Sequence, residues 1–370
     1  LHSLRRRQRQ MCIRDSFYYF DEPTSFLDVF QRLKLAKAIR KYCEDKAVMI
    51  VDHDLSFLDI VCDRIHIFYG EPSVYGVVSN PYSCRVGINN FLDGYIKEAN
   101  VRFRDEKIVF DRFLQIEAGK EKIVEFKNIR KRLGNFELYV EKGEIRKKEV
   151  LAVFGANGLG KTTFARILAN ELKVDEGEII GNIEISYKPQ FISIEFDGSV
   201  KEYFSQFINT ESSKFKNEIE KPFGLEILME KNISSLSGGE MQKIAIASCL
   251  LKNADLYVLD EPSAFLDVEE RINLARMLRR FIENNEASFM IIEHDLLMLS
   301  QLGNKALVFF GEPGKRGFAK FFDLKTGINE FLKQLDITFR FDKESRRPRA
   351  NKPGSKIDRE QKEKGIYFYV

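Results

Sequence analysis

Short runs of apolar residues, separated by longer stretches with helical spacing, organise this sequence. Four runs are continuously apolar and strand-sized: Val150–Phe154, Leu256–Leu259, Phe289–Ile292 and Ala306–Phe310. A continuous apolar run of this length is typical of a parallel strand that is covered on both faces. Helices are expected between such strands, at Thr163–Asn170 and Met241–Leu251. The pattern therefore predicts an α/β fold with a parallel sheet.

The length of these runs argues against a membrane protein. Even the longest is far shorter than the roughly 20 apolar residues that cross a bilayer, and no signal peptide is visible, so we expect a cytoplasmic protein. Of 370 residues, 44% are apolar and 31% charged, and the formal net charge of +3 argues neither for nor against nucleic acid. The cysteines lack metal-ligand spacing and are expected to be free thiols: Cys12, Cys43, Cys62, Cys84 and Cys249.

One long repeat runs through the chain. The sequence FDEPTSFLDV around Asp21 recurs as LDEPSAFLDV around Asp260, and a histidine motif follows each copy, at His53 and at His294. The offset is nearly constant, since 260 minus 21 gives 239 and 294 minus 53 gives 241. A period of this length is the size of a whole domain. The sequence therefore predicts one complete unit, roughly 120 to 345, preceded by the second half of another.

The strongest chemical signal is the segment GANGLGKT at Gly155–Thr162, which follows an apolar strand and opens a helix. In such a P-loop, glycines let backbone N–H groups curl around phosphates at a helix N-terminus. Lys161 is expected to pair with the β- and γ-phosphates and Thr162 to place its hydroxyl on magnesium. The residues expected to bind the nucleotide here are Gly155, Asn157, Gly158, Gly160, Lys161, Thr162 and Thr163.

Carboxylates at the end of the strand Leu256–Leu259 supply the second part of a nucleotide site. The apolar run places Asp260 at the carboxyl edge of the sheet, beside the P-loop, where it can hold magnesium through water. Glu261 is then the candidate general base for the attacking water. The alternative, a carboxylate that only caps the next helix, is disfavoured by the P-loop upstream.

Two further side chains have the order and spacing of phosphate sensors. Gln190, in SYKPQ, lies 29 residues after Lys161 and is expected to reach magnesium and the water. His294 follows the strand Phe289–Ile292 and is expected to contact the γ-phosphate. The predicted catalytic set is therefore Glu261, His294 and Gln190, and the predicted magnesium ligands are Thr162, Gln190 and Asp260.

A second anion-binding helix start is predicted at LSGGE, where Ser237, Gly238 and Gly239 precede the helix Met241–Leu251. One domain does not need two γ-phosphate cradles for one nucleotide. These three residues are therefore expected to serve an ATP that a partner domain holds.

In this order, P-loop, Gln190, LSGGE, Asp-Glu and His resemble the ATP-binding-cassette (ABC) ATPases. SYKPQ, LYVLDEPSAFLDVEER, FGEP and the repeated GIN-x-FL motif resemble more narrowly the RNase L inhibitor family, the subfamily-E cassette ATPases that split ribosomes. The resemblance covers Phe17 to about Phe341. It implies two cassettes facing head to tail, with each ATP between the P-loop of one and the LSGGE of the other.

The resemblance also implies cofactors and partners. The cofactors are ATP and Mg²⁺; the partners are ribosomal subunits, ribosomal RNA and a release-type factor, with no membrane. Members of the family have a domain with two iron–sulfur clusters, which we do not expect in this chain. The connectors resemble the family's hinge, where basic residues would suit phosphate contacts: Arg102, Arg104, Arg340, Arg346, Arg347 and Arg349. The end of the chain, RRPRANKPGSK, is expected to be extended and exposed.

The expected domain plan follows from the repeat and the resemblance. Residues 1–16, LHSLRRRQRQMCIRDS, are expected to be non-native or disordered. We then expect the second half of a first ABC domain at 17–79, a connector at 80–118, a complete second ABC domain at 119–318, and a second hinge with a basic tail at 319–370. The connector has a helical apolar pattern, formed by Ile88, Phe91, Leu92, Tyr95 and Ile96. No first P-loop and no first LSGGE are found, so the chain resembles a member truncated at its N-terminus.

This plan predicts one intact half-site for ATP and impaired hydrolysis. The first half retains only Asp21, Glu22 and His53. A homodimer is a further expectation, because one copy's LSGGE can cover another copy's P-loop, and the incomplete half is expected to expose sheet edges and associate. Either Phe126 or Phe136 is expected to stack on adenine. The alternatives are a subfamily-F translation factor, an ABC transporter subunit, and a scaffold in which ATP is only a structural ligand.

Overall fold

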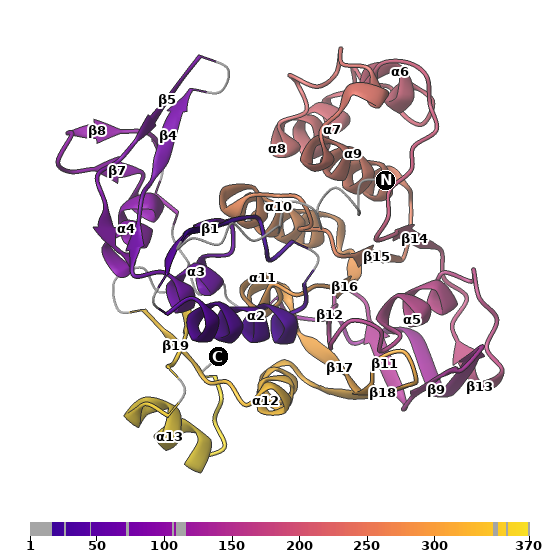
Figure 1. Cartoon of the computed structure of the whole chain (residues 1–370). Coiled ribbons are helices and arrows are strands. Elements are labelled where there is room, and N and C mark those ends of the chain that lie inside the picture. Colours follow the sequence, from indigo (N-terminus) through magenta and orange to yellow (C-terminus); the bar gives the residue numbers. More distant parts are fainter. Residues whose placement is uncertain are drawn as a thin grey trace. The chain divides into compact units, whose positions relative to one another are not determined.

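The computed structural model describes residues 17–25, 27–44, 46–71, 74–105, 107–108, 116–342, 347–352 and 354–368. The chain forms two compact units, Leu1–Glu106 and Lys107–Val370, coloured indigo to purple and magenta to yellow in Figure 1. The segment 1–16, for which the sequence predicts disorder or a non-native origin, lies outside the described residues.

Unit 2 is built on one mixed sheet of ten strands, β9 to β18 (Figure 1). Five of them form the parallel part, in the order β17 (Lys305–Glu312), β12 (Val150–Phe154), β16 (Ser288–Ile292), β15 (Leu256–Asp260) and β14 (Ile185–Lys188). Beyond β17 the sheet continues through β18 (Arg316–Asp323), β10 (Phe136–Val140), β9 (Lys122–Leu133) and β11 (Gly143–Arg146), and β13 (Glu176–Ile180) also pairs with β9. These pairings are antiparallel except that of β18 with β10, which is parallel. The predicted parallel α/β fold is confirmed.

Helices cover both faces of the parallel strands. Helix α5 (Lys161–Leu168) packs in one core with Leu307 and Phe309 of β17. Helix α12 (Leu324–Leu335) packs on the opposite face, where an added Cβ on Gly327 would lie 2.3 Å from the Cβ of Ala306. Burial on both faces explains why the strands are continuous apolar runs instead of alternating ones.

Most helices of unit 2 stand between strands in the sequence, as the apolar pattern predicts. Two of the main helices begin before their predicted starts, α5 at Lys161 and α9 at Gly238, because Gly160 and Ser237 act as their N-caps. The remaining elements are α6 (Val200–Ser205), α7 (Ser213–Phe215), the π-helix η1 (Lys216–Glu220), α8 (Lys221–Phe223), the 3₁₀-helix η2 (Ile233–Ser235), α9 (Gly238–Leu251), α10 (Val268–Asn285) and α11 (Leu296–Leu302).

Unit 1 contains a two-stranded parallel sheet, β1 (Phe17–Asp21) and β2 (Ala47–Val51), with helices α2 (Val29–Tyr42) and α3 (Leu55–Val61). One face of this sheet packs on a small core that includes Ala36 and Phe57. Smaller antiparallel pairs follow: β3 (Arg64–Ile65) with β6 (Tyr82–Ser83), β4 (Phe68–Glu71) with β5 (Tyr75–Val78), and β7 (Tyr95–Ile96) with β8 (Val101–Arg102).

The other face of β1 and β2 is exposed and apolar. Phe17 and Tyr19 are each 55% exposed, Met49 is 51% exposed and Val51 is 40% exposed. Their repeat equivalents in unit 2 have no exposed surface and belong to the core that contains α5: Leu256, Val258, Met290 and Ile292. The exposed face of unit 1 is therefore the face that the P-loop helix covers in unit 2.

The connector helix predicted from Ile88, Phe91 and Leu92 is α4 (Cys84–Asp93). The prediction was wrong in extending the helical pattern to Tyr95 and Ile96, which form β7. Helix α4 ends at Gly94, whose left-handed φ of 66° ends the helix directly before β7.

The prediction that the C-terminal stretch is exposed was wrong, whereas its extended conformation is confirmed at residues 348–350. Strands β19 (Phe339–Phe341) and β20 (Pro348–Ala350) pair, and helix α13 (Lys356–Glu363) follows them. Arg347 is 2% exposed and Asn351 is 5% exposed. Thr338 donates to Asp358 (2.7 Å), and the Asn351 amide donates to Gln361 (2.5 Å). A basic sequence looked solvated because its polar partners come from α13, which the sequence pattern did not predict. Arg346 lies outside the described residues.

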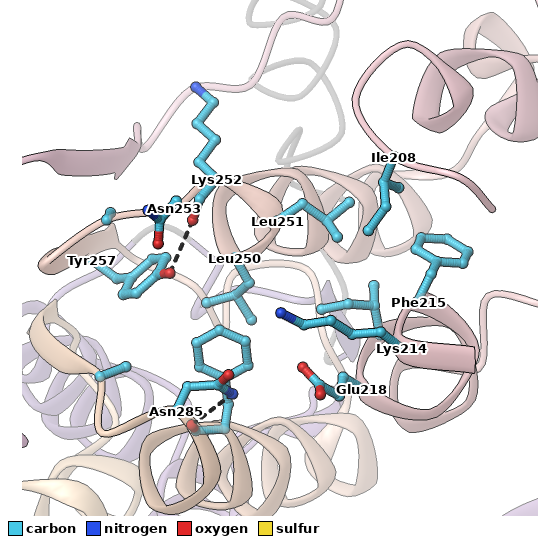
Figure 2. A pocket seen from close by; sticks show the side chains of 14 residues that line it. Ile208, Lys214, Phe215, Glu218, Leu250, Leu251, Lys252, Asn253, Tyr257 and Asn285 are labelled. Carbon is cyan, nitrogen blue, oxygen red and sulfur yellow. Dashed lines mark hydrogen bonds between the residues drawn. The ribbon is translucent and has the colours of Figure 1, made fainter. Parts of the chain in front are cut away.

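A pocket of about 200 Å³ lies between the segment around α7 and the ends of α9 and α10 (Figure 2). Its lining includes Phe215, Leu250, Tyr257 and Asn285. Tyr257 stands near the start of β15, whereas Asp260 ends that strand. The pocket therefore lies near the amino end of β15, whereas the predicted nucleotide site lies at its carboxyl end.

Candidate nucleotide site

The P-loop connects the central strand β12 to helix α5, as the sequence predicts. Gly160, the N-cap of α5, has a φ of 94°, and a Cβ there would lie 2.9 Å from the Phe136 ring. Only glycine therefore fits this turn without strain. The loop directs the first amides of α5 toward the carboxyl edge of the sheet, where a helix N-terminus favours an anion.

Lys161 lies across the loop that precedes it. Its side chain is 6% exposed, and Nζ donates to the carbonyl oxygens of Gly155 (2.8 Å) and Ala156 (2.9 Å). A lysine in this position places a positive charge in the concave side of the loop. This is the location required to pair with the β- and γ-phosphates.

Thr162 and Asp260 meet although they are 98 positions apart in the sequence. The Thr162 hydroxyl donates to Asp260 Oδ2 at 2.7 Å. Asp260 has no exposed surface, and its Oδ1 forms no hydrogen bond with the described residues. Burial raises the pKa of Asp260 to about 6, against the opposing hydrogen bond from Thr162. A buried carboxylate oxygen beside a threonine hydroxyl fits Mg²⁺, which prefers hard oxygen ligands.

Glu261 and His294 form the second pair of the site. Glu261 Oε1 lies 3.5 Å from His294 Nε2, and the two side chains are 13% and 7% exposed. Burial raises the pKa of Glu261, but hydrogen bonds from His294 and Gln190 outweigh burial and lower it overall. Gln190 is thus in contact with Glu261. Ionised at neutral pH, the Glu261 carboxylate can accept a proton from water.

The tautomer of His294 follows from its neighbours. Nε2 lies 3.0 Å from Asn157 Oδ1 and 3.5 Å from Glu261 Oε1, and both of these atoms are acceptors. Burial lowers the pKa of His294, and Nδ1 is buried without a hydrogen-bond partner in the part of the chain that the structure describes. We therefore assign a neutral imidazole with its proton on Nε2. That N–H points toward the P-loop residue Asn157, on the side where a γ-phosphate would lie.

Glu293 was missed by the sequence analysis. It is 5% exposed, and its carboxylate accepts hydrogen bonds from the backbone N–H groups of Ser263 (3.0 Å) and His294 (2.7 Å). The repeat in the sequence could have identified Glu293, because an acidic residue, Asp52, also precedes the histidine of the first copy. Asp52 accepts a hydrogen bond from Thr24 N (3.1 Å) in the same way. An acidic residue immediately before each histidine therefore fixes the segment that follows each Asp-Glu pair.

Ser237, Gly238 and Gly239 lie at the start of α9. Ser237 caps the helix, with Glu240 N donating to its hydroxyl (3.3 Å) and Ser237 N donating to Glu240 (2.8 Å). Lys231 donates to Glu240 at 2.8 Å, and this bond is the main reason that the pKa of Glu240 falls to about 2. The helix start is preformed, as expected for a site that receives an anion.

The two aromatic candidates for adenine lie in different environments. Phe126 has no exposed surface and packs edge-on against Phe164, with ring centroids 5.1 Å apart. It is therefore a core residue. Phe136 is half-buried, and its ring lies against Gly160 of the P-loop.

Unit 1 repeats the carboxylate–histidine geometry with more exposure. Glu22 Oε1 lies 3.6 Å from His53 Nε2, and these side chains are 49% and 52% exposed. Glu22 has a left-handed φ of 43°, compared with 49° at Glu261. Asp21 ends β1 as Asp260 ends β15.

Comparison with known proteins agrees with this geometry. A family model described as ABC transporter matches residues 140–264. Translation initiation factor RLI1 of Saccharomyces cerevisiae is 43% identical over 97% of this chain and 60% of its own length. A crystal structure of archaeal ribosome recycling factor aABCE1 with the ribosomal stalk protein aP1 has a TM-score of 0.88 and 47% identity, covering 96% of this chain and 70% of that chain.

A structure described as RNase-L Inhibitor matches with the same TM-score, identity and coverage. The fold and the site define an ABC-type P-loop ATPase domain. Within that class, the chain belongs to the RNase L inhibitor family, also called ABCE1 or RLI1. The chain spans 59–60% of the length of curated relatives such as RLI1. Among the described residues, no helix is both long and apolar enough to cross a membrane.

Proposed function

We propose that unit 2 binds one Mg–ATP and hydrolyses it slowly in this chain. The observation that carries the proposal is the hydrogen bond between Thr162 and Asp260, which joins the P-loop to the strand-end carboxylate. Magnesium, when bound there, would neutralise charge that develops on the phosphates. Thr162, Asp260 and Gln190 are the proposed ligands, directly or through water.

The chemistry is assigned to residues that the structure brings together. Lys161 and the amides at the start of α5 bind and orient the phosphates. Glu261 accepts the proton of the attacking water, since its carboxylate is ionised and held by His294. The His294 Nε2–H donates toward the transferred phosphoryl group from beside Asn157. Phe136, half-buried beside the P-loop, is the proposed adenine-stacking residue.

Slow turnover is proposed because the cradle formed by Ser237, Gly238 and Gly239 serves the ATP of a facing domain. The described part of unit 1 offers Asp21, Glu22 and His53 but no such helix start. A second copy of the chain could supply the missing LSGGE to the P-loop of unit 2. Turnover that rises with protein concentration would then report homodimers.

At the level of the cell, we propose a cytoplasmic ATPase that acts with ribosomal subunits and a release-type factor. The support is the relatives, which are described as translation initiation factors or as a ribosome recycling factor, and one matching structure, which is described as ribosome-bound archaeal Pelota and ABCE1. Segments 80–118 and 319–370 are the proposed hinge. Arg102 is exposed there, whereas Arg104 donates to Phe91 O and Arg347 is buried.

The experiment is equilibrium binding of a fluorescent ATP analogue with and without Mg²⁺, followed by turnover over a range of protein concentrations. We expect one site per chain, Mg²⁺-dependent affinity and low turnover. Absence of binding would contradict the ATPase proposal. Sedimentation with isolated ribosomal subunits, with and without nucleotide, tests the partner proposal separately.

A further inference from the structure

The Lys188 ammonium is buried directly beneath the carboxylate pair. Lys188 ends β14 and is 1% exposed. Its Nζ donates to the backbone carbonyl of Asp260 at 2.8 Å and to that of Glu261 at 3.3 Å. Removing an ammonium from water is costly unless charges and acceptors compensate it. The compensating negative charges nearby are those of Asp260, Glu293 and Glu261.

Gln242 reaches the same peptide group from helix α9. Its side chain has no exposed surface, and Nε2 donates to the Glu261 carbonyl at 2.7 Å. The Glu261 carbonyl therefore accepts from two buried side chains that come from different elements. The Glu261 N–H is also fixed, because it donates to the carbonyl of Ile292 at 2.8 Å.

The backbone of Glu261 requires this support. Its φ of 49° is left-handed, a strained conformation for a residue with a side chain. Such a conformation persists only where the surroundings determine it. The conformation sets the direction in which the Glu261 side chain leaves the strand, toward His294 and Gln190.

We propose that Lys188 and Gln242 are positioning residues for ATP hydrolysis, which hold the Asp260–Glu261 peptide so that the Glu261 carboxylate stays aligned on the attacking water. The inference deepens the proposed function and rests on it. Lys188 is separated from Gln190 by one residue. The same short segment therefore binds the Glu261 backbone carbonyl through Lys188 and the Glu261 carboxylate through Gln190. Gln242 connects the same carbonyl to the helix that begins at the LSGGE motif.

If the role of Lys188 were purely structural, its substitution would have different effects from those expected of a positioning residue. If Lys188 only stabilised the end of β14, its removal would lower stability and affect nucleotide binding and turnover together. A residue that acts through Glu261 should instead change kcat with little change in the KM for ATP. Its effect should also depend on whether Glu261 is present, because residues that act as a unit are not additive.

The test compares Lys188→Met with Lys188→Gln, which retains a donor, and with Lys216→Met as a matched control. Lys216 is a lysine whose ion pair with Glu211 is on the surface. We expect Lys188→Met to lower kcat about tenfold or more with KM changed less than about threefold, Lys188→Gln to recover part of the loss, and the control to be unchanged. Lys188→Met added to Glu261→Gln should cause no further loss in single-turnover measurements.

Proportional changes in kcat and KM, or the same loss in the Glu261→Gln background, would overturn the proposal. A second measurement does not depend on turnover. Amide hydrogen exchange of the segment around Glu261 should accelerate in Lys188→Met and in Gln242→Leu, while the P-loop segment remains unchanged. If the wild-type chain shows no turnover, the ATPase proposal fails on its own; unchanged exchange around Glu261 would overturn the positioning role itself.

Discussion

Glu261 Oε1 lies 3.5 Å from His294 Nε2. The repeat reproduces this pair in unit 1 as Glu22 and His53, at 3.6 Å. The two pairs share their backbone geometry but not their surroundings, since the first is buried beside a P-loop and the second is about half exposed. The chain therefore contains an internal control for any substitution at the catalytic carboxylate.

Glu261→Gln should lower ATP turnover by about 100-fold or more, because general-base catalysis typically contributes 10²–10⁴-fold, while ATP affinity is retained. Glu22→Gln should leave the turnover of unit 2 within about twofold, because the described part of unit 1 has no P-loop. Phosphate release at saturating ATP measures both. Equal effects at the two positions would contradict the assignment of Glu261.

Lys161→Ala should weaken ATP binding by about 100-fold, because it removes the charge that lies in the P-loop and pairs with the phosphates. Isothermal titration with ATP in the presence of Mg²⁺ measures the change. Lys147→Ala is a suitable control, since Lys147 forms a surface ion pair with Glu286 in the same unit. A similar loss in both variants would point to general destabilisation.

Asp260 predicts an unusual pH dependence of stability in magnesium-free buffer. Its pKa is about 6 in the folded protein, compared with an ordinary value of 3.8. Between these values the folded state binds more protons than the unfolded state, so the free energy of unfolding falls as pH rises through 6. The contribution is up to about 3 kcal/mol.

Asp260→Asn lacks this titration, so the stability difference between variant and wild type should grow from pH 4 to pH 7 in favour of the variant. Denaturant unfolding in EDTA at several pH values measures it. With saturating Mg–ATP the order should reverse, because the metal requires the ionised carboxylate. A difference that does not change with pH would contradict the burial of this charge.

Asp358→Ala should destabilise the C-terminal fold without affecting nucleotide binding. The Asp358 carboxylate accepts from Thr338 (2.7 Å) and from Gly354 N (2.8 Å), and its loss leaves buried donors without an acceptor. We expect a loss of about 1–3 kcal/mol, seen as faster hydrogen exchange in residues 336–368. Unchanged exchange there would indicate that the network does not hold the tail.

Tyr19→Thr combined with Met49→Thr should reduce concentration-dependent association of the chain. Both side chains lie on the exposed apolar face of the β1–β2 sheet, and exposed apolar faces and sheet edges promote association. Light scattering at increasing concentration measures the effect. The equivalent pair in unit 2, Val258→Thr with Met290→Thr, should instead unfold the domain, because both residues are fully buried.

Features that depend on neighbouring residues could be predicted from the sequence, whereas features that depend on burial by distant segments could not. The P-loop, Asp260 and His294 could be predicted because apolar runs place them at one edge of a sheet, whereas α5 begins earlier than predicted because Gly160 caps it. Lys188 and Gln242 gave no signal, since a lysine and a glutamine are ordinarily exposed and only the folded core shows otherwise. Similarly, the basic tail looked solvated until α13 supplied its partners.

Glu293 has a mechanical consequence. Because its carboxylate accepts hydrogen bonds from the N–H groups of both Ser263 and His294, it connects the loops that follow β15 and β16. His294 cannot move toward or away from a phosphate without displacing the residues that lead into α10. Glu293, together with the Glu261–His294 contact, therefore couples a displacement of His294 at the bound nucleotide to the start of α10.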